Sequence, residues 1–341
     1  MSRWKLFRVV KISCFFVTSL LLSRLVERPV VLCFHRIRKS SGSLLDQRIG
    51  VTDPDSFRKV INYLRILGYS FVSLENLNNS INTSKLKRVA VITFDDGYKD
   101  MYQNAFPILK SLNIPFSLFL TTSTVESEKL LWLHKLYIAI DRLSLAKRFD
   151  ILKKYEFWGK TDDDLFNIMS RIIDSNVINI MEKKSLASEI AYAAGLDEDE
   201  ERLLAEELYL TKTELREMQK HGLSIEVHGH EHLPLGNLNK AETEEEIKNS
   251  VLHSRKELNV VPKYYSIPFG INNKYFDDIV KNVELNGIVT GEQRLVKEFE
   301  NIYRLPRICM QPDNMHFYRR MARSYGKVFL EKMHLVKSDH H

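Results

Sequence analysis

Two clusters of residues with catalytic potential follow strand-like runs in the sequence. Asp95 and Asp96 stand side by side after the apolar residues 89–94, and Gly97 follows them. Burial and mutual repulsion both oppose the ionisation of two adjacent carboxyl groups, so the pair needs a partner. A divalent cation is the natural partner, because one acid could bind it while the other stays free to act as a base. The alternative is that one acid caps the helix expected from Tyr98, which would employ only one of the two.

The second cluster places three histidines, His228, His230 and His232, within five residues. If the preceding strand continued, its period of two would put all three on one face. If the chain turns at Gly229, His228 and His232 can converge across a loop. Two imidazoles with the carboxylate of Asp96 would make a three-ligand site with an open position, the pattern of catalytic zinc. The alternative is a solvated histidine-rich loop.

The elements that must position these clusters alternate between strands and helices. We expect strands at 30–34, 69–74, 89–94, 115–121, 223–227, 264–267, 287–290 and 303–310. We expect helices at 54–67, 98–112, 211–222, 241–258 and 275–283. This alternation predicts an α/β fold with a parallel sheet and right-handed crossovers. Such folds place their chemistry at the carboxyl edge of the sheet, where both clusters fall.

One long stretch, residues 125–210, interrupts the alternation. It is rich in Leu, Ile, Lys, Glu and Asp, includes a run of acids at 197–201, and shows neither strand signals nor catalytic spacing. We expect a helical insertion that divides one catalytic domain into residues 28–124 and 211–325, with a tail at 326–341. A lid, a partner-docking element and a plain surface elaboration all fit such a segment.

The overall composition is that of a globular protein. The chain has 341 residues, of which 44% are apolar and 28% charged, which excludes a disordered, collagen-like or coiled-coil protein. Its three cysteines, Cys14, Cys33 and Cys309, are widely spaced and odd in number. A disulfide scaffold and a cysteine-based zinc module are therefore excluded.

The net charge of +6 lies entirely in residues 1–36, which hold seven cations and one acid. The rest of the chain sums to zero, so we expect no nucleic-acid partner. The basic, apolar segment at 1–27 contains an uncharged run at 12–23, which is too short to span a bilayer, and no small-residue cleavage site follows it.

We expect residues 1–26 to form a helix on an anionic membrane face, with the cytoplasmic side as first choice. A helix packed on the protein itself is one alternative. The other is an uncleaved signal anchor that places the protein in the periplasm.

Four stretches resemble motifs of the polysaccharide deacetylases, the NodB-homology domain of carbohydrate esterase family four. They are Thr-Phe-Asp-Asp-Gly at 93–97, His-x-x-x-His at 228–232 with Gly229 where the family has a hydroxyl residue, Tyr-Tyr-Ser-Ile-Pro-Phe-Gly at 264–270, and Val-Leu-Cys-Phe-His-Arg-Ile at 31–37. The last is similar to the first strand of members found in surface-polysaccharide gene sets. The resemblance covers about 30–125 and 210–312, and the first two motifs are specific when they occur together.

The resemblance implies an irregular (β/α) barrel of about seven strands. It implies that Asp95 is the base and that Asp96, His228 and His232 hold one divalent metal ion, zinc or another first-row metal. The implied function is removal of N-acetyl groups from an amino sugar of a bacterial surface polysaccharide or its lipid-linked precursor. An O-acetyl esterase acting on the same substrates and an inactive carbohydrate-binding relative are the alternatives.

The sequence departs from the family pattern at two places. Ser266 stands where the third motif often has an arginine that orients the base, and Arg307 could substitute from the last strand. A surface salt bridge is the alternative for Arg307. The family's final histidine, a general acid, has no match. His35 is the best-placed replacement, His316 is a weaker one, and a satisfied core histidine is the alternative for His35.

Overall fold

Nine of the described strands form one parallel sheet, and the short β2 (Arg36–Ile37) and β3 (Val51–Thr52) pair separately. The computed structural model describes residues 17–22, 25–82, 88–154, 165–175, 178–297, 301, 303–310 and 314–332. The strands of the sheet are β1 (Val30–Phe34), β4 (Ser70–Phe71), β5 (Val89–Asp96), β6 (Phe116–Leu120), β7 (Leu223–Val227), β8 (Tyr264–Ser266), β9 (Gly287–Thr290), β10 (Arg304–Pro306) and β11 (Ile308–Cys309). Their order is β10-β9-β8-β7-β6-β5-β1-β11, with β4 paired to β5 outside this path.

The sheet closes on itself through a single residue. β10 pairs with β9 and β11 pairs with β1, and only Arg307 separates β10 from β11 along the chain. The strand predicted at 303–310 is therefore one strand bent at Arg307, just after Pro306, which has no N–H for a ladder. The backbone N–H of Arg307 still donates to the Thr290 carbonyl at 3.1 Å. Counted this way, the ring has seven strand positions, and the predicted α/β barrel is confirmed.

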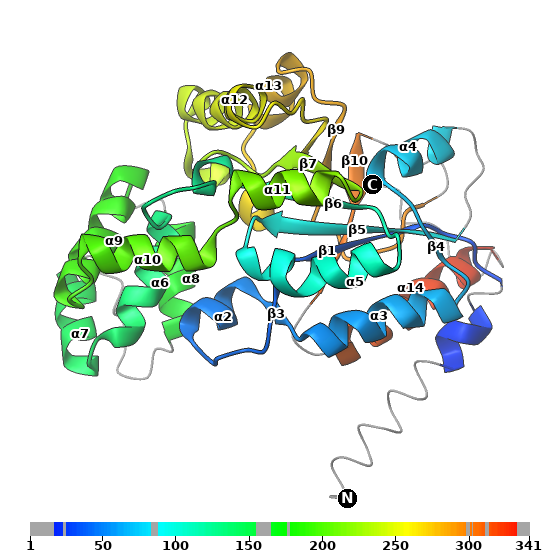
Figure 1. The fold of residues 1–341 in the computed structure, drawn as a ribbon, viewed down its shortest axis with the longest axis horizontal. Coiled ribbons are helices and arrows are strands. Elements are labelled where there is room, and N and C mark those ends of the chain that lie inside the picture. The colour runs from blue at the N-terminus through cyan, green and yellow to red at the C-terminus, as the bar shows by residue number, and fades with distance from the viewer. Residues whose placement is uncertain are drawn as a thin grey trace, which may run out of the picture.

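Helices cover the outside of this ring. They include α2 (Leu44–Ile49), α3 (Pro54–Ile66), α4 (Leu74–Asn82), α5 (Phe106–Ser111), α11 (Lys212–Gln219), α12 (Lys240–Glu257), α13 (Phe276–Asn282) and α14 (Asn314–Lys332). In Figure 1, α3 and α14 lie below the sheet and α12 and α13 above it. Because strands enclosed in this way are buried on both faces, they read as continuous apolar runs. All five residues of β1 are buried, for example.

Two predicted elements differ from the observed ones. The strand expected at 69–74 shrinks to the two-residue β4, because the chain turns into α4 at Leu74. The helix expected at 98–112 contains a π-helical turn, Met101–Ala105, and is α-helical again from Phe106 to Ser111. Pro107 accounts for this irregularity, since it cannot donate the hydrogen bond of a continuous α-helix.

The described part of residues 125–210 is helical. Its helices are α6 (Trp132–Arg142), α7 (Leu145–Lys154), α8 (Leu165–Asp174), α9 (Ile180–Ala193) and α10 (Glu198–Leu208). They gather at the left of Figure 1, beyond the arrowhead of β5 and so at the carboxyl end of the strands. Leu136 of α6, Ile168 of α8 and Ile190 of α9 are fully buried in one apolar cluster.

The described part of the N-terminal segment packs on the protein with one face. Residues 17–22 are helical, Ser19 and Val26 are buried, and Leu20 packs against the core beneath α3 and α14. The opposite face is exposed. Residues 1–16 and 23–24 of the predicted membrane helix, and 333–341 of the predicted tail, lie outside the described residues. Among the helices that the structure describes, none is both long enough and apolar enough to cross a bilayer.

Candidate active site

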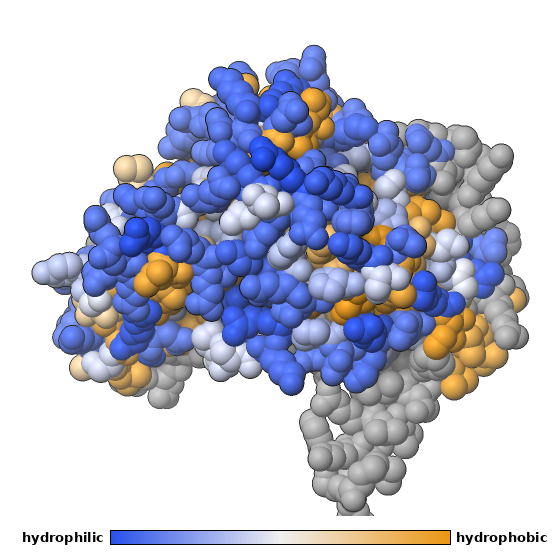
Figure 2. Space-filling view, viewed as in Figure 1, coloured by the Kyte–Doolittle hydropathy of each residue, from blue (hydrophilic) through white to orange (hydrophobic). Residues whose placement is uncertain are grey.

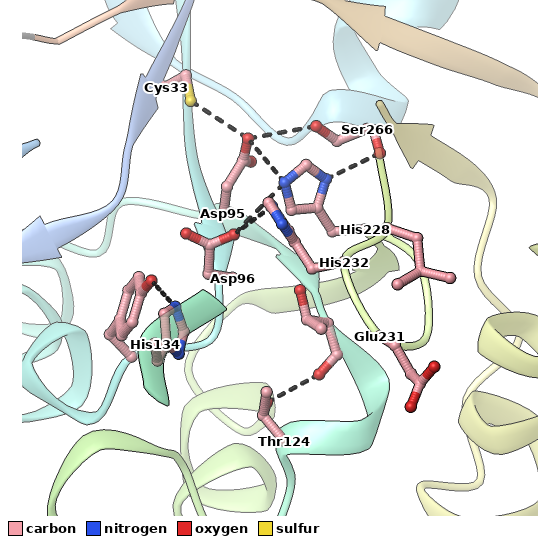
Figure 3. A network of polar contacts seen from close by, with 12 residues as sticks. Cys33, Asp95, Asp96, Thr124, His134, His228, Glu231, His232 and Ser266 are labelled. Carbon is pink, nitrogen blue, oxygen red and sulfur yellow. Dashed lines mark hydrogen bonds and ion pairs between the residues drawn. The ribbon is translucent and has the colours of Figure 1, made fainter. Parts of the chain in front are cut away.

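The carboxyl ends of β5 and β7 bring the three predicted metal ligands together. Asp96 ends β5, His228 follows β7 directly, and His232 comes after a tight turn. Nε2 of His228 lies 3.4 Å from Asp96 Oδ1, and Nε2 of His232 lies 3.2 Å from the same oxygen. The ligand atoms of all three side chains lie within 4.8 Å of one another. Figure 3 shows these side chains converging on one point.

The hydrogen bonds around these side chains fit a bound cation. Nδ1 of His228 lies 2.8 Å from the carbonyl oxygen of Ser266, which can only accept, so Nδ1 carries the proton and Nε2 is a bare lone pair. Burial lowers the pKa of His228 to about 4, which keeps the ring neutral at physiological pH. Asp96 Oδ1 is buried and has no hydrogen-bond partner. The lone pair on Nε2 of His228 thus faces the negatively charged Oδ1 of Asp96. A divalent cation bound by this oxygen and by the nitrogens of His228 and His232 would relieve the repulsion.

Several backbone conformations at this point are strained. Asp96, His232 and Phe269 have φ of +75°, +56° and +58°, in the left-handed region that residues other than glycine rarely adopt. Such conformations cost about 1–3 kcal/mol each and persist where the surroundings impose them. The ring of Phe269 packs edge-on against that of His232, with 4.6 Å between centroids. The strained backbone at Asp96 and His232, together with the packing of Phe269, holds these two side chains in their converging positions.

A buried glutamate, Glu246 of α12, holds the loop between the two histidines. Its Oε1 accepts the backbone N–H of Glu231 at 2.8 Å and that of Leu233 at 3.4 Å. A Cβ atom on Gly229 would lie 2.5 Å from the same oxygen. Gly229 therefore stands in place of the expected hydroxyl residue because the Glu246 carboxylate occupies the space above it. Burial raises the pKa of Glu246 to about 7.

Asp95 is held in a buried ion pair. Nη1 and Nη2 of Arg307 donate to Asp95 Oδ1 and Oδ2 at 2.7 and 2.8 Å. Ser266 Oγ and Cys33 Sγ also donate to Oδ2, at 3.2 and 3.5 Å. Burial opposes ionisation of Asp95, but the charge of Arg307 outweighs it and brings the pKa to about 2. Arg307 is 4% exposed, so the surface salt-bridge alternative is wrong.

These groups line one cavity of about 320 Å³, which we call the active-site cavity. Its walls include Asp95, Asp96, His35, His228, His232, Arg307 and Cys309, together with Arg48 of α2 and Leu133, His134 and Tyr137 of α6. His35 lies close to the base, since ligand atoms of Cys33, His35 and Asp95 fall within 4.8 Å of one another. His316 is exposed on α14 and does not line this cavity.

The helical insertion contributes a wall that sequence reasoning missed. Nε2 of His134 lies 2.7 Å from the hydroxyl of Tyr98, and Nδ1 lies 2.7 Å from that of Tyr209. Burial lowers the pKa of His134 to about 3, so this ring is neutral, and both of its nitrogens are engaged in hydrogen bonds to the two tyrosines. The sequence gives no signal for it, because His134 has no nearby partner in sequence and reaches the cavity only through the packing of α6.

Parts of this chain match known polysaccharide deacetylases. A family model described as polysaccharide deacetylase matches residues 82–288. A poly-β-1,6-N-acetyl-D-glucosamine N-deacetylase of Staphylococcus epidermidis is 33% identical over 109 residues, which are 29% of this chain and 37% of that protein. One of Escherichia coli K12 is 30% identical over 101 residues, which are 27% of this chain and 15% of that protein. The matches thus span well under half of these relatives.

Solved structures share the fold over most of the chain. The Streptococcus pyogenes deacetylase PplD superimposes with a TM-score of 0.58 at 18% identity, covering 87% of this chain and 98% of that one. IcaB from Ammonifex degensii gives a TM-score of 0.55 at 17% identity, covering 88% and 97%. At these identities the likeness shows the fold alone.

Proposed function

This chain belongs to the polysaccharide deacetylase family, and from that premise we propose that it is a metal-dependent hydrolase that removes N-acetyl groups from an amino sugar of a bacterial surface polysaccharide or its lipid-linked precursor. The observation that carries the proposal is the presence, in one cavity, of three converging metal-binding side chains beside an ionised carboxylate, Asp95. The names of the curated relatives favour a substrate that contains N-acetylglucosamine.

Asp96, His228 and His232 would hold the ion, in our proposal one zinc or another first-row metal. When bound, the ion would lower the pKa of a water molecule and polarise the acetyl carbonyl. Asp95 takes the proton of the attacking water. Its low pKa makes it a weak base, so it accepts a proton only from a strongly acidified water and gives it up readily.

Arg307 and His35 complete the proposed roles. Arg307 positions the Asp95 carboxylate through its two hydrogen bonds. His35 is placed to protonate the sugar nitrogen as it leaves. A bond forms between the water oxygen and the acetyl carbon, the bond from that carbon to nitrogen breaks, and acetate and a free amine result.

We also propose that residues 1–26 hold the enzyme on an anionic membrane, with the cytoplasmic face as first choice. The support is the basic start of the chain and the exposed face of the helix at 17–22, where Val17 and Leu21 are more than half exposed. Basic residues beside an apolar face bind anionic lipid surfaces.

The test of the enzymatic proposal is acetate release from oligomers of β-1,6-linked N-acetylglucosamine by zinc-loaded protein. We expect turnover that a chelator abolishes and zinc restores, and almost none from His232→Ala, which should bind little zinc. Release from an O-acetylated oligomer alone would instead show an esterase. Oligomer binding without release of acetate, at full zinc occupancy, would show an inactive relative and overturn the proposal.

A further inference from the structure

The C-terminal helix α14 has two contrasting faces. Its inner face is buried in the core by Phe317, Met321 and Tyr325. Its outer face carries what we call the cationic stripe, formed by His316, Arg319, Arg320, Arg323 and Lys327. These residues recur every three or four positions, so they share one side of the helix. Within the described part of the chain, no carboxylate pairs with Arg319, Arg323 or Lys327.

The cationic stripe lines a cavity of about 380 Å³, separate from the active-site cavity. Arg294, on the loop after β9, also lines the cavity, but its Nε is paired with Oε2 of Glu292 at 2.8 Å. No acid is found among the described residues that line the cavity. Arg319, Arg323 and Lys327 therefore repel one another, and the arrangement favours a ligand with several negative charges.

The helix α14 that carries the stripe connects two places of functional interest. At one end, Gln293 receives the backbone N–H of Cys309 on its Oε1 at 3.2 Å and Nη1 of Arg320 on its carbonyl at 3.1 Å, and Cys309 lines the active-site cavity. At the other end, the hydroxyl of Tyr325 donates to that of Tyr69 at 2.8 Å, and Tyr69 donates to the carbonyl of Arg28 at 2.9 Å.

These contacts orient α14 relative to the barrel. The helix follows β11, leaves the carboxyl end of the strands and returns to their amino end, where residues 17–22 and 25–28 lie (Figure 1). The stripe therefore runs along the side of the barrel from the rim of the active-site cavity to the N-terminal segment.

An apolar patch lies at that end of the stripe. Val17, Leu21 and Leu25 are 52%, 60% and 54% exposed and are spaced four residues apart. Figure 2 shows an apolar area at the lower right of the molecule, where Figure 1 places the helix at residues 17–22. Cations beside exposed leucines are typical of surfaces that bind anionic bilayers, whereas a soluble polyanion would gain nothing from the leucines.

We propose that the cationic stripe is a docking surface for an anionic lipid bilayer, whose headgroup phosphates occupy the basic cavity. The barrel then lies on its side, with the rim of the active-site cavity at the lipid surface, within reach of a lipid-linked saccharide. This inference rests on the membrane association proposed above for residues 1–26, and assigns a second, folded contact to it.

The experiment uses the full chain with vesicles of phosphatidylcholine, with or without phosphatidylglycerol. The test variant is Arg319→Gln/Arg323→Gln/Lys327→Gln. The matched control, Lys220→Gln/Lys240→Gln/Lys256→Gln, removes the same charge from the ends of α11 and α12, on the other side of the barrel. We expect the test variant to bind anionic vesicles at least about tenfold more weakly, and the control within about twofold of the parent.

Both variants should melt like the parent and turn over a water-soluble oligomer at its rate, because none of the six residues lines the active-site cavity. Equal vesicle binding by the test and control variants would overturn the inference. If Val17→Ser/Leu21→Ser then weakened binding, the association proposed for residues 1–26 would still stand. The inference would also be contradicted if the test variant lost binding to soluble polyanions but bound vesicles like the parent.

Discussion

Arg307 meets Asp95 through two parallel hydrogen bonds, 2.7 and 2.8 Å long, at the point where the closing strand of the barrel bends. One residue thus joins the ends of the sheet and orients the proposed base. Its backbone N–H binds Thr290 across the ring while its side chain turns into the active-site cavity. The position of the base therefore depends on the closure of the barrel.

Arg307→Lys should keep the charge but lose the two-pronged contact, because an ammonium group cannot match both carboxylate oxygens in one plane. We expect kcat to fall roughly 10- to 100-fold with little change in KM, since the effect acts on the reacting groups rather than on binding. Steady-state acetate release measures both constants. A parent-like kcat would show that Asp95 needs no such positioning.

Gly229→Ala should weaken zinc binding roughly 10- to 100-fold, because the new Cβ would displace the Glu246 carboxylate, which holds the loop between His228 and His232. Gly195→Ala is the matched control, since Gly195 also has a left-handed φ, +71°, but nothing lies within 4 Å of its Cβ position. Gly195→Ala should lower stability by about 1 kcal/mol, and Gly229→Ala by more, because it also displaces Glu246 from its two backbone N–H donors. Competition with a zinc-binding dye measures the affinity, and an equal loss in both variants would contradict the role of Glu246.

The buried Glu226 should make the free energy of unfolding depend on pH. Burial raises its pKa to about 7, although the N–H groups of Lys263 and Tyr264 donate to it and partly oppose this. Between the unfolded value near 4.3 and about 7, the folded state binds more protons than the unfolded state. The contribution of Glu226 to the free energy of unfolding therefore falls as pH rises through this window.

Glu226→Gln keeps an oxygen for both N–H groups and removes the titration. The variant should match the parent near pH 4 and exceed it by roughly 2–4 kcal/mol at pH 8. Urea unfolding at several pH values measures this difference. If parent and variant showed the same slope against pH, Glu226 would not titrate with a raised pKa.

Val17→Ser/Leu21→Ser tests the proposed contact of residues 1–26 with lipid. Both side chains are more than half exposed, so the melting temperature should hardly change, while binding to anionic vesicles should weaken about fivefold or more. A chain beginning at Glu27 is a poorer test, because it also removes the buried Ser19 and Val26 from the core and should melt at a lower temperature. Unchanged vesicle binding by the double variant would contradict the contact.

The barrel and the convergence of the proposed metal ligands could be predicted because their signals are local. Apolar runs that end in acids or histidines mark strand ends, and parallel strands bring those ends to one edge. The sequence therefore led to Asp95, Asp96, His228 and His232 without any knowledge of their contacts.

The supporting residues could not be predicted, because their roles arise from packing between distant elements. Glu246 stands among other acids on α12, and nothing in its neighbourhood points to the loop that it holds. His134 reaches the active-site cavity only because α6 packs over the strand ends. The bend at Arg307 divides a run that reads as one uninterrupted strand.

Zinc content and acetate release, measured together in Asp95→Asn, test most directly whether Asp95 is the base. We expect one zinc per chain, which also shows that the variant is folded, and a turnover lowered by roughly 10²- to 10⁴-fold, because the base is lost while the proposed metal ligands remain. Turnover near the parent rate at full zinc occupancy would contradict the proposed mechanism, since Asp95 would then not be the base.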